Sequence, residues 1–219
     1  MLWPNFCIDN FFQNPDSVLD FAKTLKFYKT NGTYPGERTK PLHEIDHDFF
    51  LNVTKKIVAC LYPNDVKNLI WCANQYFQKI KPQKYSTKGF IHQDVGGTEF
   101  TSIIYLSDNE SNTCIYKRLK ENIPNHLKIK EDMYLNKIKQ SSPRFQKALK
   151  ENNESYKKTI EFKSIKNRMI LFDGSVDHGV ESFGRKNEKE RLTLITFFSS
   201  ISRTDGKDLK FHSSECKRY

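Results

Sequence analysis

The sequence lacks the features of a membrane protein and of a secreted one. Among its 219 residues no apolar run approaches the length that crosses a bilayer. The opening segment, residues 1–5, has neither the basic start nor the extended apolar run of a signal peptide. We therefore expect a cytoplasmic protein that does not associate with membranes.

Cysteine is sparse and shows no pairing pattern. The five cysteines are odd in number and contain no Cys-x-x-Cys pair. This spacing favours reduced thiols over a disulfide framework or a zinc cluster. The cysteines are Cys7, Cys60, Cys72, Cys114 and Cys216.

The formal net charge of +10 raises the question of a nucleic-acid partner. The lysines are spread along the chain, however, and the densest stretch, from Lys117 to Lys158, mixes Lys with Glu in the way that solvated helix faces do. A nucleic-acid partner is therefore not favoured. A basic surface also suits an anionic cosubstrate or an acidic partner.

The most informative pattern is His92-Gln93-Asp94, with His178 much later in the chain. On a β-strand alternate side chains share a face, so His92 and Asp94 could face one metal ion. His178 follows the apolar run 169–172 and could supply the third ligand from another strand. Two histidines and one carboxylate form the face that binds Fe(II) and leaves other coordination positions open.

A second pattern begins at Arg191, the first residue of the apolar run 191–198, which reads as a buried strand. A guanidinium is costly to bury unless a carboxylate meets it. Thr193 shares the face of Arg191, and together they suit the distal end of a dicarboxylate. The alternative is that Arg191 starts its strand in solvent and pairs with Glu188 or Glu190.

The order of predicted elements indicates one domain, mainly β with flanking helices. A short strand at 6–8 precedes a helix that starts at Asn14 or Asp16 and a second helix over 49–61, with a loop at 29–41. Such helices usually pack on the outside of the larger sheet. Strands are then predicted at 68–77, 90–95, 100–106, 113–116, 159–162, 168–172 and 192–199.

This strand count is typical of a double-stranded β-helix, the jelly-roll or cupin-like core. We expect helical N-terminal support in 1–67, the core in 68–200 and a C-terminal tail in 201–219. Residues 118–158 read as an insertion of one or two helices. It could be a lid or a substrate-binding arm, or it could only cover a sheet edge.

The order His-x-Asp, distal His, then Arg-x-Thr opening the last strand resembles the iron(II)/2-oxoglutarate-dependent oxygenase superfamily. More narrowly, the chain is similar to small bacterial and phage members related to the prolyl-hydroxylase branch. The similarity runs from about residue 5 to residue 200. Supporting segments are 34–39, 97–101, 103–106 and 167–172.

The resemblance implies Fe(II), 2-oxoglutarate and O2 as cofactors, with His92, Asp94 and His178 as the catalytic metal ligands. It implies that Arg191 and Thr193 bind the C5 carboxylate and that Arg38, in the 34–39 loop, anchors substrate. Further residues considered for the cosubstrate pocket share a polar side chain on or near the predicted strands; they are Tyr105, Tyr85, Asn74 and Tyr76. For Tyr105 and Tyr85, a core ring with a satisfied hydroxyl is the alternative role.

The resemblance implies hydroxylation of a C–H bond in a peptidyl or free amino-acid substrate, coupled to conversion of 2-oxoglutarate to succinate and CO2. The partner would be a small molecule or a peptide, and the enzyme a monomer or homodimer. Prolyl hydroxylases usually have Lys where this chain has Arg191, and the nucleic-acid-repair branch carries a second Arg where this chain has 196–198. The alternatives are a non-catalytic jelly-roll protein that binds an anionic partner and an oxygenase acting on nucleic acid.

Overall fold

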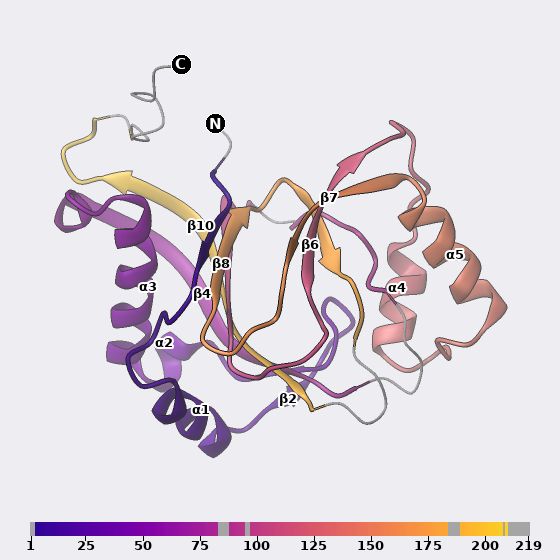
Figure 1. Ribbon diagram of the computed structural model, residues 1–219, viewed down its shortest axis with the longest axis horizontal. Helices are drawn as coiled ribbons and strands as arrows, with labels where there is room; N and C mark the ends of the chain where they lie inside the picture. The colour runs from indigo at the N-terminus through magenta and orange to yellow at the C-terminus, as the bar shows by residue number, and fades with distance from the viewer. Residues whose placement is uncertain (1–2, 83–87, 95–96, 184–188, 208, 210–219) are drawn as a thin grey trace.

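The structure, a computed structural model, describes residues 3–82, 88–94, 97–183, 189–207 and 209. Its strands are β1 (Phe6–Ile8), β2 (Tyr28–Lys29), β3 (Glu37–Arg38), β4 (Leu69–Ile80), β5 (Phe100–Tyr105), β6 (Thr113–Arg118), β7 (Tyr156–Phe162), β8 (Met169–Asp173), β9 (Asp177–Val180) and β10 (Arg191–Arg203). They form a seven-stranded sheet in the order β1-β8-β5-β10-β4-β3-β2 and a three-stranded sheet in the order β7-β6-β9 (Figure 1). Every pairing is antiparallel. The predicted mainly β jelly roll is confirmed.

The outer face of the large sheet is covered by the N-terminal helices α1 (Pro15–Thr24), α2 (Leu42–Ile45) and α3 (His47–Leu61). The Asn14 side chain accepts a hydrogen bond from the Ser17 N–H (3.2 Å) and so caps α1, with Pro15 in the first turn. Their apolar faces join the odd-numbered residues of β4, such as Phe77, in one buried cluster. The sequence predicted α1 and α3 in this role.

The inner face of the large sheet meets the small sheet. Ile103, Phe172 and Ile195 of the large sheet pack with Ile115 and Phe162 of the small one. This apolar contact joins the two sheets, and its large-sheet residues also line the cavity described below. Alternate side chains of a strand point to opposite sides of its sheet, so β4 contributes to both layers. Phe77 packs in the cluster with the helices, and the adjacent Tyr76 lines the cavity.

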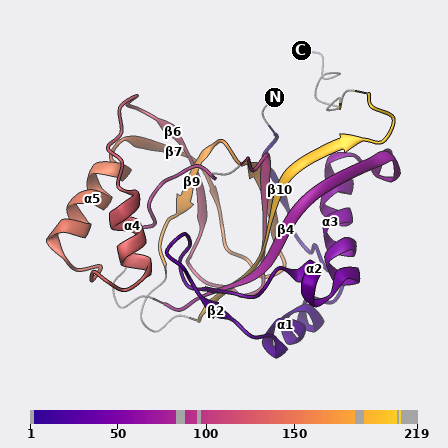
Figure 2. The same cartoon turned by 180° about the vertical axis from the view of Figure 1, so that it is seen from behind.

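The predicted insertion forms two helices, α4 (Leu127–Tyr134) and α5 (Pro143–Asn153), between β6 and β7. Both views place them on the side of the sheets away from α1, α2 and α3 (Figures 1 and 2). They bury Met133, Phe145 and Leu149 against Phe90, which lies two residues before His92. The insertion therefore packs directly against the segment that carries the His-x-Asp pattern.

Several local predictions were wrong. The segment at 90–95 is not a strand in its described part; it makes an isolated bridge, His92 with His178. The 29–41 loop contains β3 and the end of β2, because Glu37 and Arg38 pair with the edge of β4. The four-residue helix α2, the 3-10 turn η1 (Val66–Asn68) and the strand β9 were not anticipated. Each is short enough that its own sequence carries no periodic signal.

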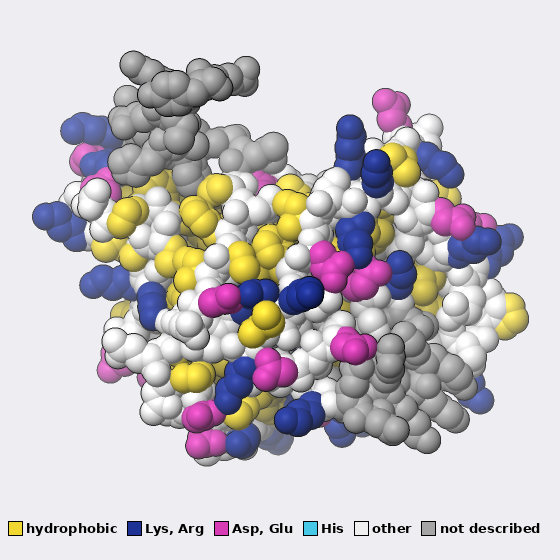
Figure 3. All heavy atoms as spheres, viewed as in Figure 1, with side chains coloured by type: hydrophobic (Ala, Val, Ile, Leu, Met, Phe, Trp, Pro, Cys, Tyr) yellow, Lys and Arg dark blue, Asp and Glu magenta, His cyan; other side chains and the backbone are white. Residues whose placement is uncertain are grey.

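None of the described helices is long and apolar enough to cross a bilayer. The four described cysteines, Cys7, Cys60, Cys72 and Cys114, are free thiols. On the face shown in Figure 3, Lys and Arg side chains alternate with Asp and Glu rather than gathering in one basic patch. That face offers no continuous cationic track of the kind that follows a nucleic-acid backbone.

Candidate metal centre

The structure brings His92, Asp94 and His178 together. One potential ligand atom from each lies within 4.8 Å of the other two. His178 Nε2 is 3.6 Å from Asp94 Oδ1, and the two imidazole rings are 4.6 Å apart between centroids. Among the described residues this is the group of His, Cys, Asp and Glu side chains that could hold a metal ion. Two nitrogens and one oxygen suit Fe(II), with further coordination positions open.

Backbone hydrogen bonds fix the three residues relative to one another. The His92 N–H donates to the His178 carbonyl (2.9 Å), and the His178 N–H donates back to the His92 carbonyl (2.8 Å). The Asp94 N–H donates to the carbonyl of Gly174 (2.9 Å). A Cβ on Gly174 would lie 2.4 Å from the Thr98 carbonyl oxygen, so this close approach requires glycine.

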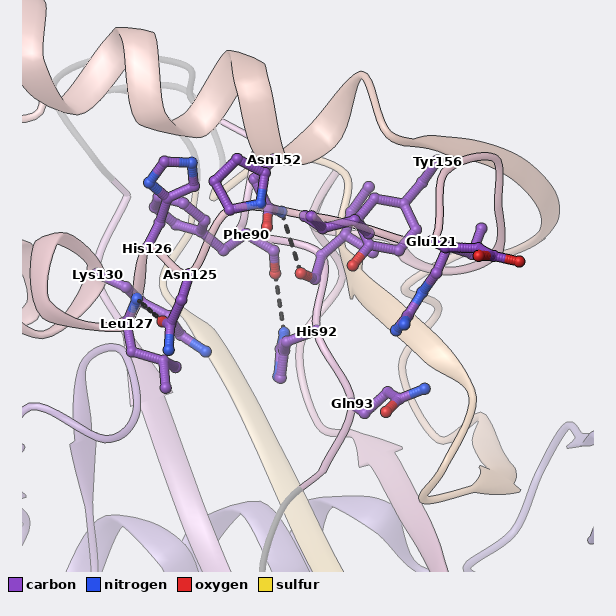
Figure 4. Close-up of a pocket in the computed structure, with 14 residues that line it drawn as sticks. Phe90, His92, Gln93, Glu121, Asn125, His126, Leu127, Lys130, Asn152 and Tyr156 are labelled. Atoms are coloured by element: carbon purple, nitrogen blue, oxygen red, sulfur yellow. Dashed lines mark hydrogen bonds between the residues drawn. The ribbon is translucent and has the colours of Figure 1, made fainter.

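The insertion helix α5 supports the same segment from the other side. The Asn152 side chain donates to the Ile91 carbonyl (3.1 Å), one residue before His92 (Figure 4). Asn153 donates to the Gly89 carbonyl (2.9 Å) and accepts from the Ile91 N–H (3.2 Å). The segment is thus held as an extended chain between α5 and the small sheet without belonging to either sheet.

Both histidines present the same ring nitrogen to the centre. His92 Nδ1 is 2.8 Å from the Phe90 carbonyl, and His178 Nδ1 is 2.9 Å from the Val176 carbonyl. A carbonyl can only accept, so in the neutral ring Nδ1 carries the proton and Nε2 keeps its lone pair. Carbonyl oxygens behind Nδ1 are the usual way in which a protein orients histidine ligands for a metal.

Asp94 is oriented by Thr101 of β5. The Thr101 hydroxyl donates to Asp94 Oδ2 (2.5 Å), which leaves Oδ1 directed toward His178. Burial by itself would raise the pKa of Asp94, but the hydrogen bonds and charge from His178 and the hydrogen bond from Thr101 outweigh it and lower this pKa to about 2. The carboxylate is therefore ionised at neutral pH, as a metal ligand must be.

Burial, the nearby Lys130 ammonium and His178 lower the pKa of His92 to about 3. The imidazole is consequently neutral over the physiological range. The metal need not displace a proton from it. The surroundings of His92 thus favour the protonation state that metal binding requires.

The centre opens into a cavity of about 580 Å³ between the sheets. This volume is within the range of small-molecule sites in proteins. Its walls come from β4, β10, the segment that carries β3, and α4. The lining residues used below are Tyr34, Arg38, Asn74, Tyr76, His92, Asp94, Thr101, Thr113, Lys130, Glu131, Tyr134, His178, Arg191 and Phe197.

Arg191 lines this cavity and is 3 % exposed. Its Nη2 is 3.5 Å from the Thr113 hydroxyl and its guanidinium carbon is 5.5 Å from the Tyr105 ring centroid. No carboxylate of the described residues pairs with it, and its Nε has no hydrogen-bond partner there. Burial lowers the pKa of Arg191. A buried cation without a counter-ion indicates an anion that the fold itself does not supply.

The topology places Arg191 near the metal ligands. Thr113, which it contacts, lies on β6 two residues from Ile115, and Ile115 pairs with His178. Two residues of strand span roughly 7 Å. A five-carbon dicarboxylate that binds a metal through one end and a guanidinium through the other suits a gap of this order.

The other predicted cosubstrate residues occupy different positions. Thr193 is buried on the face of Arg191, and its hydroxyl has no hydrogen-bond partner in the described part of the chain. The Tyr105 hydroxyl is already engaged, since it donates to Thr113 (2.8 Å) from a fully buried ring. Tyr76 and Asn74 line the cavity, but their strand partners Ile195 and Phe197 stand four and six residues along β10 from Arg191. Tyr85 lies outside the described residues.

The structure does not place Arg191 in solvent at the start of its strand. Its side chain is buried, and no ion pair joins it to Glu190. Glu188 lies outside the described residues.

Arg38, predicted as a substrate anchor, does reach the cavity. Its guanidinium carbon is 4.0 Å from the Tyr34 ring centroid, 5.2 Å from that of Phe197 and 5.5 Å from that of Tyr76. Burial lowers the pKa of Arg38 to about 10, although nearby tyrosines and Asp94 oppose the change. The guanidinium remains charged at neutral pH.

Sequence reasoning missed three residues of the site. Thr101 and Thr113 lie in apolar strands, where a threonine is expected to be an ordinary buried residue. Nothing in the sequence distinguishes these two threonines, which contact Asp94 and Arg191, from threonines without such contacts. Lys130 lies on α4 among other lysines of the insertion, a pattern that predicts a solvated helix face. Only the packing of α4 on Phe90 turns this one lysine inward.

Comparison with family models gives a match over residues 3–198, to a family described as "Family of unknown function (DUF6445)". The chain belongs to this family. No curated protein sequence matches the chain.

Solved structures with the same fold include a prolyl-4-hydroxylase from Pseudomonas putida (TM-score 0.52, 11 % identity, covering 89 % of this chain and 91 % of that one). HygX from Streptomyces hygroscopicus, solved with nickel and 2-oxoglutarate, has a TM-score of 0.52 at 12 % identity over 89 % and 82 % of the two chains. A prolyl hydroxylase from Trichoplax adhaerens, in complex with a peptide, has a TM-score of 0.51 at 10 % identity over the same shares. At these identities the likeness shows a shared fold.

Proposed function

We propose that the protein is an Fe(II)- and 2-oxoglutarate-dependent dioxygenase that hydroxylates a C–H bond of a peptidyl or free amino-acid substrate. The observation that carries the proposal is the combination of two features in one cavity. Three ligand atoms of the right kind converge in His92, Asp94 and His178, and a buried, unpaired Arg191 lies within reach of them. The shared fold with proteins solved with 2-oxoglutarate supports the same reading.

In this proposal His92 Nε2, Asp94 Oδ1 and His178 Nε2 hold the ferrous ion. When bound, iron and 2-oxoglutarate supply the oxidative decarboxylation that couples O2 to oxidation of a substrate C–H bond. The chain itself supplies orientation. The Phe90 and Val176 carbonyls keep both imidazoles in the tautomer that faces the metal, and Thr101 turns Asp94 toward it.

Arg191 would bind the C5 carboxylate of 2-oxoglutarate through two of its N–H groups, and the orphaned Thr193 hydroxyl lies on the same face to add a third hydrogen bond. Arg191 and Thr193 fit 2-oxoglutarate because the C5 carboxylate would be the counter-ion that Arg191 lacks among the described residues. Tyr105 serves as a positioning residue instead, since its hydroxyl orients Thr113 beside the guanidinium.

The second candidate is a non-catalytic protein that uses the cavity to bind an anion. The unpaired arginines of the cavity favour it as well. The two candidates differ in the metal, because a binding protein has no need of two imidazole nitrogens and an ionised carboxylate that converge at one point. An oxygenase acting on nucleic acid is the third candidate, and the mixed charge of the visible surface does not favour it.

The test is anaerobic addition of Fe(II) and 2-oxoglutarate, followed by the weak visible charge-transfer band of the chelate. Wild type should give the band, His178→Ala should not, and Arg191→Ala should need far more 2-oxoglutarate to reach it. Arg168→Ala is the matched control, because this arginine pairs with Asp9 on the surface and lies outside the cavity. Absence of a band in fully reduced wild type would overturn the dioxygenase proposal in favour of the binding protein.

A further inference from the structure

Besides Arg191, two further cationic side chains line the cavity. Arg38 comes from β3 in the N-terminal region, and Lys130 comes from α4 in the insertion. Neither has an ion-pair partner among the described residues, whereas the nearby α4 residue Lys128 pairs with Asp132 (3.3 Å). Lys130 also lines a smaller neighbouring cavity of about 430 Å³ together with His92 (Figure 4).

The surroundings of Arg38 leave one edge of its guanidinium available. The rings of Tyr34, Tyr76 and Phe197 surround the group at 4.0–5.5 Å from their centroids. Aromatic faces stabilise the cation but accept no strong hydrogen bond in its plane. Its Nε is buried with no hydrogen-bond partner in the described chain, and the residue as a whole is partly exposed where it lines the cavity. A planar anion in the cavity would satisfy the guanidinium.

The two cations are held in fixed relation although they are far apart in sequence. Gly32, in the turn that precedes Arg38, packs on the end of α4: a Cβ on Gly32 would lie 3.6 Å from Glu131 on the helix and 3.3 Å from the side chain of Leu135, which follows it. Tyr134, also on α4, lines the same cavity; burial raises the pKa of its hydroxyl, and the Arg38 charge lies close enough to oppose that rise. The arrangement therefore exists before any ligand binds.

The charges of the loaded site show what is missing. Once the ferrous ion and Arg191 are balanced by Asp94 and the two carboxylates of 2-oxoglutarate, Arg38 and Lys130 remain. Glu131 is the further acidic residue among those described that line the cavity, and it offsets one of them. One positive charge is left over in a largely desolvated space, where an unpaired charge is costly.

We propose that the primary substrate carries a carboxylate, bound by the guanidinium edge of Arg38 and the ammonium of Lys130, and is a small amino-acid-like molecule. This inference rests on the proposed function and names the substrate class of the same site. The tyrosine and phenylalanine rings around Arg38 form the wall for the rest of the molecule. The planar fork of Arg38 matches a carboxylate, and one net charge matches a monoanion better than a phosphate dianion.

The test compares acids with their amides. Protein loaded with Ni(II) and 2-oxoglutarate, which does not turn over, is titrated calorimetrically with N-acetyl derivatives of Gly, Leu, Phe, Pro and Lys, each as the free acid and as the primary amide. A charge-assisted contact predicts that at least one acid binds roughly 10- to 100-fold more tightly than its amide. Phenyl phosphate is the phosphate probe.

The variants assign the effect to residues. Arg38→Gln and Lys130→Met should each reduce the preference for the acid to within about threefold, and Arg38→Lys should restore only part of it, because Lys lacks the fork. Lys128→Met is the matched control on the same helix, with a side chain that is 70 % exposed, and should keep the full preference. Equal affinity of every acid and amide, including no binding of either, overturns the proposal. So does tighter binding of phenyl phosphate than of any acid, or an acid preference that survives in Arg38→Gln.

Failure here is distinguishable from failure of the proposed function. The Fe(II)–2-oxoglutarate band of wild type tests the proposed function without any reference to Arg38 or Lys130. A normal band without any acid preference would refute the substrate class alone. Absence of the band in wild type would refute the oxygenase, while an acid preference measured in metal-free protein would still establish the anion site.

Discussion

Replacing Arg191 with Met should make the metal-free protein more stable while destroying its response to 2-oxoglutarate. Arg191 is 3 % exposed and has no carboxylate partner in the described chain, so the fold bears the cost of a buried charge. Replacing buried ionic groups by apolar residues of similar volume is commonly neutral or stabilising by about 1–4 kcal/mol. For a chain of 219 residues, a gain of about 1–3 kcal/mol corresponds to a rise in Tm of roughly 2–10 °C.

The ligand response should change in the opposite direction. With Ni(II) present and 2-oxoglutarate at about 100 times its Kd, binding stabilises wild type by about 2.7 kcal/mol. Loss of charge-assisted hydrogen bonds worth about 3 kcal/mol in Arg191→Met raises the Kd roughly 150-fold. The same 2-oxoglutarate concentration should then stabilise the variant by less than about 0.5 kcal/mol.

Differential scanning calorimetry with and without ligand measures both effects. Arg168→Met is the control: its guanidinium binds Asp9 through two contacts of 2.6 and 2.8 Å, so the variant should gain no stability and should keep the ligand response. If Arg191→Met loses more than about 2 kcal/mol and still responds to 2-oxoglutarate, the side chain has a structural partner and the reasoning is refuted.

Three further changes test the metal centre. Thr101→Val removes the hydrogen bond to Asp94 without changing volume and should weaken Co(II) affinity about 10- to 100-fold in a spectroscopic titration; unchanged affinity would mean that Thr101 does not orient the ligand. Because the pKa of His92 is lowered to about 3, the unfolded metal-free chain binds a proton below pH 6.5 that the folded chain does not. Stability should therefore fall by about 2 kcal/mol for this group between pH 7.5 and 5, a loss that urea unfolding should find absent in His92→Gln. Gly174→Ala forces a Cβ to within 2.4 Å of the Thr98 carbonyl and should lower both Tm and metal affinity, whereas a variant with wild-type values would show that this turn relaxes freely.

The sequence was sufficient for the elements with a strong period or a cap. The helix at 15–24 follows from Asn14, Pro15 and apolar residues at helical spacing, and the first part of the strand at 191–203 follows from the apolar run 191–198. The strand continues to Arg203, into the segment predicted as a C-terminal tail, because residues 200–203 pair with the start of β4. The approach of His92, Asp94 and His178 was predicted from order and alternation along strands, and it is what the structure has. The strand invoked to explain the first pair does not form, however; bridging hydrogen bonds to His178 and side chains from α5 hold that segment extended instead.

What the sequence could not supply are contacts between distant segments. Thr113 and Arg191 meet because β6 and β10 belong to different sheets that face each other, and Lys130 turns inward because α4 packs on Phe90. Periodicity reports which face of an element is apolar, but it does not report what that face meets. The sequence therefore could not predict that Arg38 of β3 and Lys130 of α4 line the same cavity.

The reciprocal hydrogen bonds between His92 and His178 divide the centre into a stiff part and a compliant part. The backbones of His92 and His178 are joined directly by two hydrogen bonds, whereas Asp94 is held through its own N–H at Gly174 and through the Thr101 hydroxyl. Metals of different radius should therefore be accommodated mainly by a shift of the Asp94 carboxylate relative to the histidines, with the distance between the two histidines nearly unchanged.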